Sequence, residues 1–114
     1  MQDFSKDKRL LNKAAFDRVF SNANKIVTSE FVILHQENIV GHARLGLALS
    51  KKKIAKACQR NRFRRVLRES FRMHILPAVD IICLARHSLK GVDNSAVYNH
   101  LEQAWDKLAF FYKK

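Results

Sequence analysis

The sequence predicts an α+β fold, a two-layer sandwich of three helices on a sheet of about four strands, in the order helix, three strands, helix, strand, helix. Three observations predict it. Apolar residues recur at helical spacing in three segments, β-branched and aromatic residues crowd residues 25–36, and the apolar run over 79–85 does not alternate. The last pattern is typical of a central strand covered on both faces. At 114 residues, the chain is expected to form a single domain over residues 1–114.

The first helix is expected over residues 12–20, because Phe16, Val19 and Phe20 recur at helical spacing behind Asn12, a favourable N-cap residue. The run Ser-Asn-Ala-Asn that follows should end this helix.

Extended chain is expected next, over residues 25–36, as two strand segments or as one strand with a break near Ser29-Glu30. After a turn at 38–42, residues 43–50 alternate leucines with Arg, Gly, Ala and Ser. One sheet face should therefore be packed, while the other carries only small or polar groups. That second face could accept a ligand or lie under a closely packed helix.

The second helix is expected within residues 51–72, and it should end before Pro77, the only proline. Its buried stripe is predicted from helical spacing to contain Phe63, Val66, Leu67, Ser70 and His74, with Phe71 at the edge. The broad opposite face then carries Arg60, Asn61, Arg64, Arg65, Arg68 and Arg72.

The chain should finish with a strand, a loop and a helix. The strand is the apolar run 79–85, and the loop spans residues 87–94. The last helix should begin near Asn94 or Ser95 and bury a stripe made of Val97, Leu101, Ala104, Trp105, Leu108 and Phe111.

Charge is concentrated in residues 51–72, which contain ten Lys or Arg and one Glu and so carry nine of the chain's twelve net positive charges. Such a patch favours a polyanionic partner, above all nucleic acid. Arginine forks engage phosphate bidentately and stack on bases. The alternative is a solvated charged helix, but like charges at i,i+4 then repel one another without a partner to neutralise them.

Composition narrows the class of protein further. Hydrophobic residues make up 47% of the chain, which disfavours a disordered polycation. The apolar runs are too short for a membrane span, and the first residues lack the apolar core of a signal peptide. Cys58 and Cys83 have no paired spacing, which fits a reducing, cytoplasmic location without disulfides.

One group of motifs resembles the bacterial ribonuclease P protein family. The group comprises Gly46-Leu47, Ser50-Lys51-Lys52, Arg60-Asn61-Arg62, Arg64-Arg65, Arg68-Glu69 and Phe71, and the Arg-Asn-Arg triplet within this frame is the family's signature. Weaker matches at Arg9-Leu10, Phe16, Val19-Phe20 and 80–86 extend the resemblance over nearly the whole chain.

The resemblance implies an accessory protein of a ribozyme. In the family, a catalytic RNA removes the 5′ leader of precursor tRNA with magnesium ions, while the small basic protein binds that RNA and the leader. The resemblance also implies a left-handed βαβ crossover, against the general rule. It implies no cofactor bound by the protein, no membrane and no obligate protein partner.

Site residues carried over by motif fall into two sets. The RNA-binding set is Lys52, Lys53, Lys56, Arg60, Asn61, Arg62, Arg64, Arg65 and Arg68. The leader-binding set is Phe16 and Phe20, two aromatics one helical turn apart that suit stacking of unpaired bases or, alternatively, belong to the core. Where some relatives have a sheet aromatic facing the leader cleft, this chain has Leu34.

Three other functions compete with this interpretation. A protein nuclease acting alone needs convergent carboxylates or a positioned His pair, but the acids are scattered, with only Asp80 at a strand start, and the five histidines have no ligand-like spacing. No catalytic residue and no metal site is therefore predicted. A ribosomal protein or general RNA chaperone would share the basicity without the Arg-Asn-Arg frame. A DNA-recognition helix would carry more Asn and Gln for reading bases.

Overall fold

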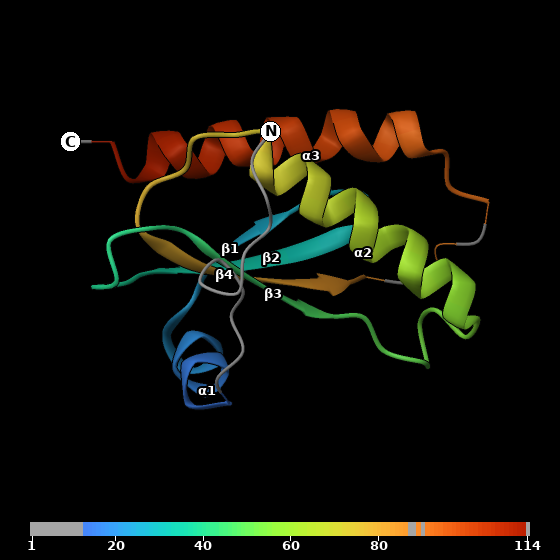
Figure 1. The fold of residues 1–114 in the computed structure, drawn as a ribbon, viewed down its shortest axis with the longest axis horizontal. Coiled ribbons are helices and arrows are strands. Elements are labelled where there is room, and N and C mark those ends of the chain that lie inside the picture. Colours follow the sequence, from blue (N-terminus) through green and yellow to red (C-terminus); the bar gives the residue numbers. More distant parts are fainter. Residues whose placement is uncertain (1–12, 87–88, 90, 114) are drawn as a thin grey trace.

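The computed structural model describes residues 13–86, 89 and 91–113, and Figure 1 shows its helices and strands. They follow the predicted order: α1 (Lys13–Asn22), β1 (Asn24–Val27), β2 (Phe31–Glu37), β3 (Arg44–Ala48), α2 (Ala57–Arg72), β4 (Val79–Ala85) and α3 (Asn94–Phe111). The expected break between two strand segments falls between β1 and β2. Asn12, the expected N-cap of the first helix, lies outside the described residues.

The four strands form one mixed sheet in the order β1-β2-β4-β3. β2 pairs antiparallel with both β1 and β4, whereas β3 and β4 are parallel neighbours joined through α2. β4 is thus a central strand, as its apolar run predicts, and six of its seven residues are buried. The left hand of the β3–α2–β4 crossover stays a prediction from the resemblance.

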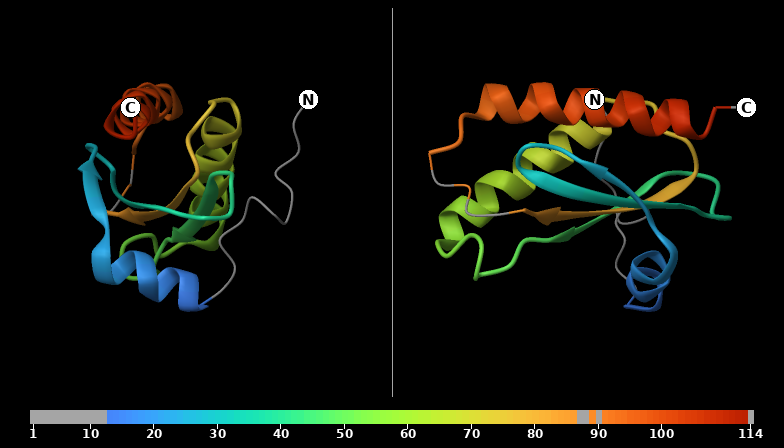
Figure 2. Two further views of the ribbon diagram at one scale, coloured as in Figure 1. Left: turned by 90° about the vertical axis from the view of Figure 1, so that its left-hand side faces the viewer. Right: turned by 180° about the vertical axis from the view of Figure 1, so that it is seen from behind.

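α2 and α3 cover one face of the sheet and form the predicted sandwich with it (Figures 1 and 2). Phe31, Ile33, Ile81 and Cys83 point from the strands into this core, and Phe63 and Trp105 are among the helix side chains that meet them. Ser70 belongs to the buried stripe of α2, as predicted, because its hydroxyl accepts a hydrogen bond from Trp105 Nε1 at 2.8 Å.

α1 lies on the opposite face of the sheet and covers only part of it (Figure 2). Val19 is fully buried against Ile82, and Phe16, Leu34 and Leu84 are among the partly buried residues around this contact. The small-residue face that the alternation in 43–50 predicts is the face under α1, where Ala48 packs. Among the described helices and strands, none besides α1 covers the rest of this face (Figure 2).

The basic segment is only partly helical, because α2 begins at Ala57 and not among the lysines. Ser50 O accepts hydrogen bonds from the backbone N–H groups of Lys53 at 3.2 Å and Ile54 at 2.9 Å, which closes a turn. This turn places Ile54 in the core, 5% exposed, and leaves the three lysines before it in solvent.

Three side chains differ from their predicted stripes. His74 lies beyond the end of α2, and Phe71 is fully within the buried stripe instead of at its edge. Phe111 stays 56% exposed, because its ring contacts His35 and Tyr112 at the last turn of α3 while its outer side faces solvent. Within the described residues, no helix is both long and apolar enough to span a membrane.

Candidate nucleic-acid interface

The outward face of α2 and the turn before it carry the basic residues that the sequence singles out. Lys52, Lys56, Asn61 and Arg65 are exposed, and Arg64 and Arg68 are partly exposed. Arg64 Nη1 donates to Asn61 Oδ1 at 3.0 Å, which orients both side chains one turn apart. The predicted face thus exists as a surface of closely spaced hydrogen-bond donors, suited to phosphate oxygens.

The single acid of the segment does not interrupt this face. Glu69 Oε2 accepts a hydrogen bond from the Tyr98 hydroxyl of α3 at 2.6 Å. Burial, together with the hydrogen bond to Glu69, raises the pKa of Tyr98 to about 12. Glu69 therefore serves the α2–α3 contact.

Two predicted RNA contacts, Lys53 and Arg60, also make bonds within the protein. Arg60 Nη1 donates to the carbonyl oxygens of Ile54 at 2.8 Å and Ala55 at 2.9 Å. Lys53 Nζ donates to the carbonyl oxygen of Arg86 at 2.6 Å, at the end of β4. Together these bonds tie the lysine turn to α2 and to the sheet.

Arg62 is engaged more fully. Its Nε donates to Asn94 Oδ1 at 2.7 Å, its Nη1 donates to Gln59 Oε1 at 3.0 Å, and its Nη2 donates to the carbonyl oxygen of Val92. The guanidinium carbon also lies 4.8 Å from the centre of the Phe63 ring. Arg62 therefore joins α2 to the start of α3 and to the residues just before it. Helical spacing leaves Arg62 off the predicted outward face, but the sequence did not identify Val92 and Asn94 as its partners, which lie 30 and 32 residues away.

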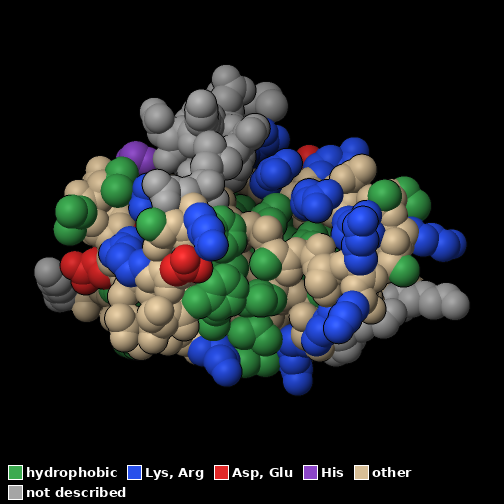
Figure 3. Space-filling model, turned by 90° about the horizontal axis from the view of Figure 1, so that it is seen from below, with side chains coloured by type: hydrophobic (Ala, Val, Ile, Leu, Met, Phe, Trp, Pro, Cys, Tyr) green, Lys and Arg blue, Asp and Glu red, His purple; other side chains and the backbone are tan. Residues whose placement is uncertain are grey.

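A groove lies on the open part of the sheet, beside α1. Its volume is about 400 Å³, and it is lined by Phe20, Lys25, Val32, Leu34, Lys53, Leu84, Ala85 and Arg86. Figure 3 views this face: an apolar patch occupies its centre, and Lys and Arg side chains gather beside it, toward the end of the molecule where Figure 1 has the lysine turn. The sequence alone did not single out Lys25, Val32, Leu84 or Arg86 as part of a site.

The two predicted leader residues are placed differently in α1. Phe20 is 49% exposed and forms part of the groove, whereas Phe16 is partly buried around Val19. Their ring centres are 6.5 Å apart. The alternative that both belong to the core therefore does not describe Phe20, while Phe16 contributes to packing.

A buried carboxylate, Asp80, anchors the other side of α1. Its oxygens accept hydrogen bonds from Arg44 Nε at 2.7 Å and Nη2 at 2.8 Å, from Asn38 Nδ2 at 2.8 Å and from Arg18 Nη2 at 2.5 Å. Burial by itself raises the pKa of Asp80, but the hydrogen bonds from Arg44, Asn38 and Arg18 outweigh it, so the pKa lies below its usual value.

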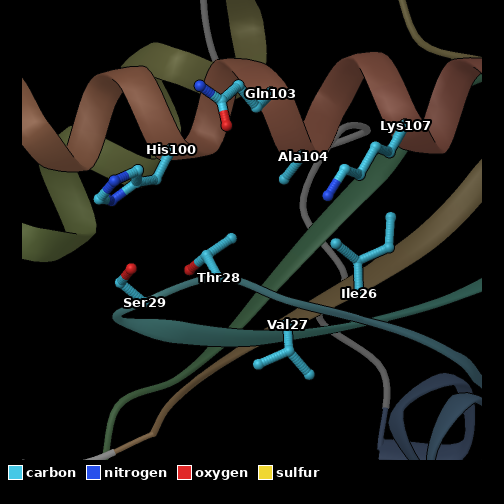
Figure 4. Close-up of a pocket in the computed structure, with 8 residues that line it drawn as sticks. All are labelled: Ile26, Val27, Thr28, Ser29, His100, Gln103, Ala104 and Lys107. Atoms are coloured by element: carbon cyan, nitrogen blue, oxygen red, sulfur yellow. The ribbon is translucent and has the colours of Figure 1, made fainter.

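A second, polar cavity of about 170 Å³ lies between the β1–β2 turn and α3, where Figure 4 shows Lys107 reaching from α3 toward β1. His100 lines it and contacts the buried carboxylate of Glu30 at 2.9 Å. Elsewhere, burial raises the pKa of the Cys83 thiol to about 12, which leaves this cysteine unreactive.

Comparison with known proteins identifies the family to which the chain belongs. The family model described as ribonuclease P matches residues 4–109. The chain belongs to the ribonuclease P protein family. The ribonuclease P protein component of Legionella pneumophila (strain Corby) is 56% identical over 111 residues, covering 97% of each chain. That of Pseudomonas entomophila is 42% identical over 110 residues, covering 94% of this chain and 83% of the relative.

Solved structures of the family share the architecture. The RNase P protein of Staphylococcus aureus matches with a TM-score of 0.81 and 31% identity, over 90% of this chain and 97% of that one. The RNase P protein of Thermotoga maritima matches with a TM-score of 0.77 and 28% identity, over 87% of this chain and 96% of that one. The resemblance to this family and the predicted α+β fold are thereby confirmed.

Proposed function

We propose that this ribonuclease P protein serves as the protein subunit of an endoribonuclease whose catalytic part is RNA. The outward face of α2 and the segment before it bind the catalytic RNA through Lys52, Lys56, Asn61, Arg64, Arg65 and Arg68. The groove beside α1 holds the single-stranded 5′ leader of precursor tRNA. The RNA performs the cleavage with magnesium ions, and the protein contributes binding and orientation. Its proposed location is the cytoplasm.

The observation that carries this proposal is the continuity of the two surfaces. Lys53 belongs to the lysine turn that leads into α2, and its side chain also lines the groove next to Phe20. An aromatic wall, an aliphatic floor and cationic rims suit unpaired bases on a phosphate backbone, with stacking worth about 1–3 kcal/mol per base. One nucleic-acid partner can therefore run from the groove to the basic face.

The direct test is leader removal from precursor tRNA by the catalytic RNA, with and without the protein, over a magnesium series. We expect the protein to lower the magnesium concentration needed for cleavage, because a cationic surface replaces screening ions between two polyanions. Protein without RNA should leave the substrate intact. Cleavage by the protein alone, or an unchanged magnesium dependence, would contradict the proposal; the latter result would favour a general RNA chaperone or ribosomal protein.

Replacing Phe20 by alanine should reduce the preference of the assembled enzyme for precursor over mature tRNA by roughly tenfold, the value of about one stacked base. Because the Phe20 ring is half exposed, the protein should stay folded. Binding of both tRNA forms is measured alongside thermal melting, with Phe110→Ala, another exposed phenylalanine outside the groove, as the control. If folded Phe20→Ala discriminates as well as the parent, Phe20 does not contact the leader.

A further inference from the structure

α1 is held on the sheet by two neighbouring residues with different chemistry. Val19 is buried against Ile82, while Arg18 Nη2 donates to Asp80 Oδ2 at 2.5 Å. The helix has ten residues, a length at which an isolated helix is only marginally stable in water. Its orientation therefore depends on these contacts with the sheet.

The geometry of the helix separates the anchor from the groove. Successive residues are about 100° apart around an α-helix, so Arg18 and Phe20 are about 200° apart and flank Val19. Arg18 consequently contacts the sheet on one side of α1, and Phe20 forms the wall of the groove on the other. A rotation of α1 about its Val19 contact would move the Phe20 ring toward or away from the groove floor.

Asp80 is a fixed point against such a rotation. It is completely buried in the central strand, and Arg44 from β3 and Asn38 from the β2–β3 turn hold its two oxygens. Asn38 Nδ2 also donates to the His42 carbonyl oxygen at 3.1 Å, which ties the turn into the same network. The Arg18 bond is thus a charge-assisted link from a short surface helix to a buried carboxylate that the sheet and its turn already hold.

We propose that Asp80, acting through Arg18, fixes the rotation of α1 and thereby sets the shape of the groove beside Phe20. Arg18 and Asp80 are then positioning residues for the leader, and neither needs to touch it. This inference rests on the proposed function for its consequence, the preference for precursor tRNA, but its geometric part concerns the protein alone.

Arg18→Met tests the proposal, because it removes the link to Asp80 and keeps the length of the side chain, while Arg44 and Asn38 still satisfy the carboxylate. Lys13→Met removes an equal charge from the exposed start of α1 and serves as the control. Two measurements are made: methyl NMR spectra of the groove leucines Leu34 and Leu84 in the free protein, and the precursor-to-mature preference of the assembled enzyme. Affinity for the catalytic RNA is recorded in parallel.

We expect Arg18→Met, but not Lys13→Met, to shift the Leu34 and Leu84 methyl signals and to lower the preference for precursor by roughly tenfold, with catalytic-RNA affinity unchanged. Arg18→Lys, which restores a cation next to Asp80, should recover part of both effects. Unchanged methyl signals would overturn the positioning role. Shifted signals with full precursor preference would also overturn it, and if Phe20→Ala is then neutral as well, the leader groove itself fails.

Discussion

Asp80→Ala is expected to lower the free energy of unfolding by about 3 kcal/mol. This is the low end of the range for breaking a buried ion pair, because Arg18 and Arg44 retain access to water when their partner is lost. Asn38, itself 6% exposed, loses one acceptor. Denaturant unfolding measures the change. Asp17→Ala, an exposed carboxylate on α1, is the control and should change stability by no more than about 0.5 kcal/mol.

The stability difference between the parent and Asp80→Ala should also depend on pH, in a direction that the pKa of Asp80 fixes. The folded-state pKa of Asp80 is lowered, so its network contributes stability above the unfolded value of about 4 and loses it as pH falls through the folded pKa. The stability difference between the parent and Asp80→Ala should therefore be full at pH 7 and shrink in acid, below about pH 4. A difference that stays constant down to pH 3 would show that Asp80 is not a paired, ionised carboxylate.

Arg65→Ala and Arg62→Ala should have opposite consequences although each removes one charge from α2. With about six phosphate contacts, the parent should bind catalytic RNA with a log K against log salt slope of roughly −4 to −5. Arg65 is exposed on the outward face, so its loss should flatten that slope by about one contact and leave melting unchanged. Arg62 donates hydrogen bonds to Gln59 of α2, to Val92 and to Asn94 at the start of α3, so its loss should leave the slope unchanged.

The cost of Arg62→Ala should instead appear as about 1–3 kcal/mol of stability, from the lost hydrogen bonds and the contact with Phe63. Salt titrations and unfolding curves on both variants separate these roles, with Arg62→Lys as a variant that keeps the charge but not the fork. A flattened slope in Arg62→Ala without loss of stability would make Arg62 a phosphate contact after all.

The spacing of apolar residues along the chain predicted which side of α2 is buried and which strand is central. Phe63, Val66 and Leu67 form the buried stripe of α2 because helical periodicity places them on one side, and the strand 79–85 is central because its apolar residues do not alternate with polar ones. The start of α2 was not predictable in this way, since the turn at Ser50 depends on Ile54 reaching a core assembled by other elements.

The sequence by itself determined the order of the elements, the buried stripe of α2, the concentration of positive charge and the family, because each is written in the identity and spacing of nearby residues. Only the tertiary structure decided which arginines bond to distant parts of the protein and which residues line the groove. Arg62 meets Val92, and Arg18 meets Asp80. Such partners are far apart in the chain, and arginines with the same chemistry differ only in what the topology brings within reach of their guanidinium groups.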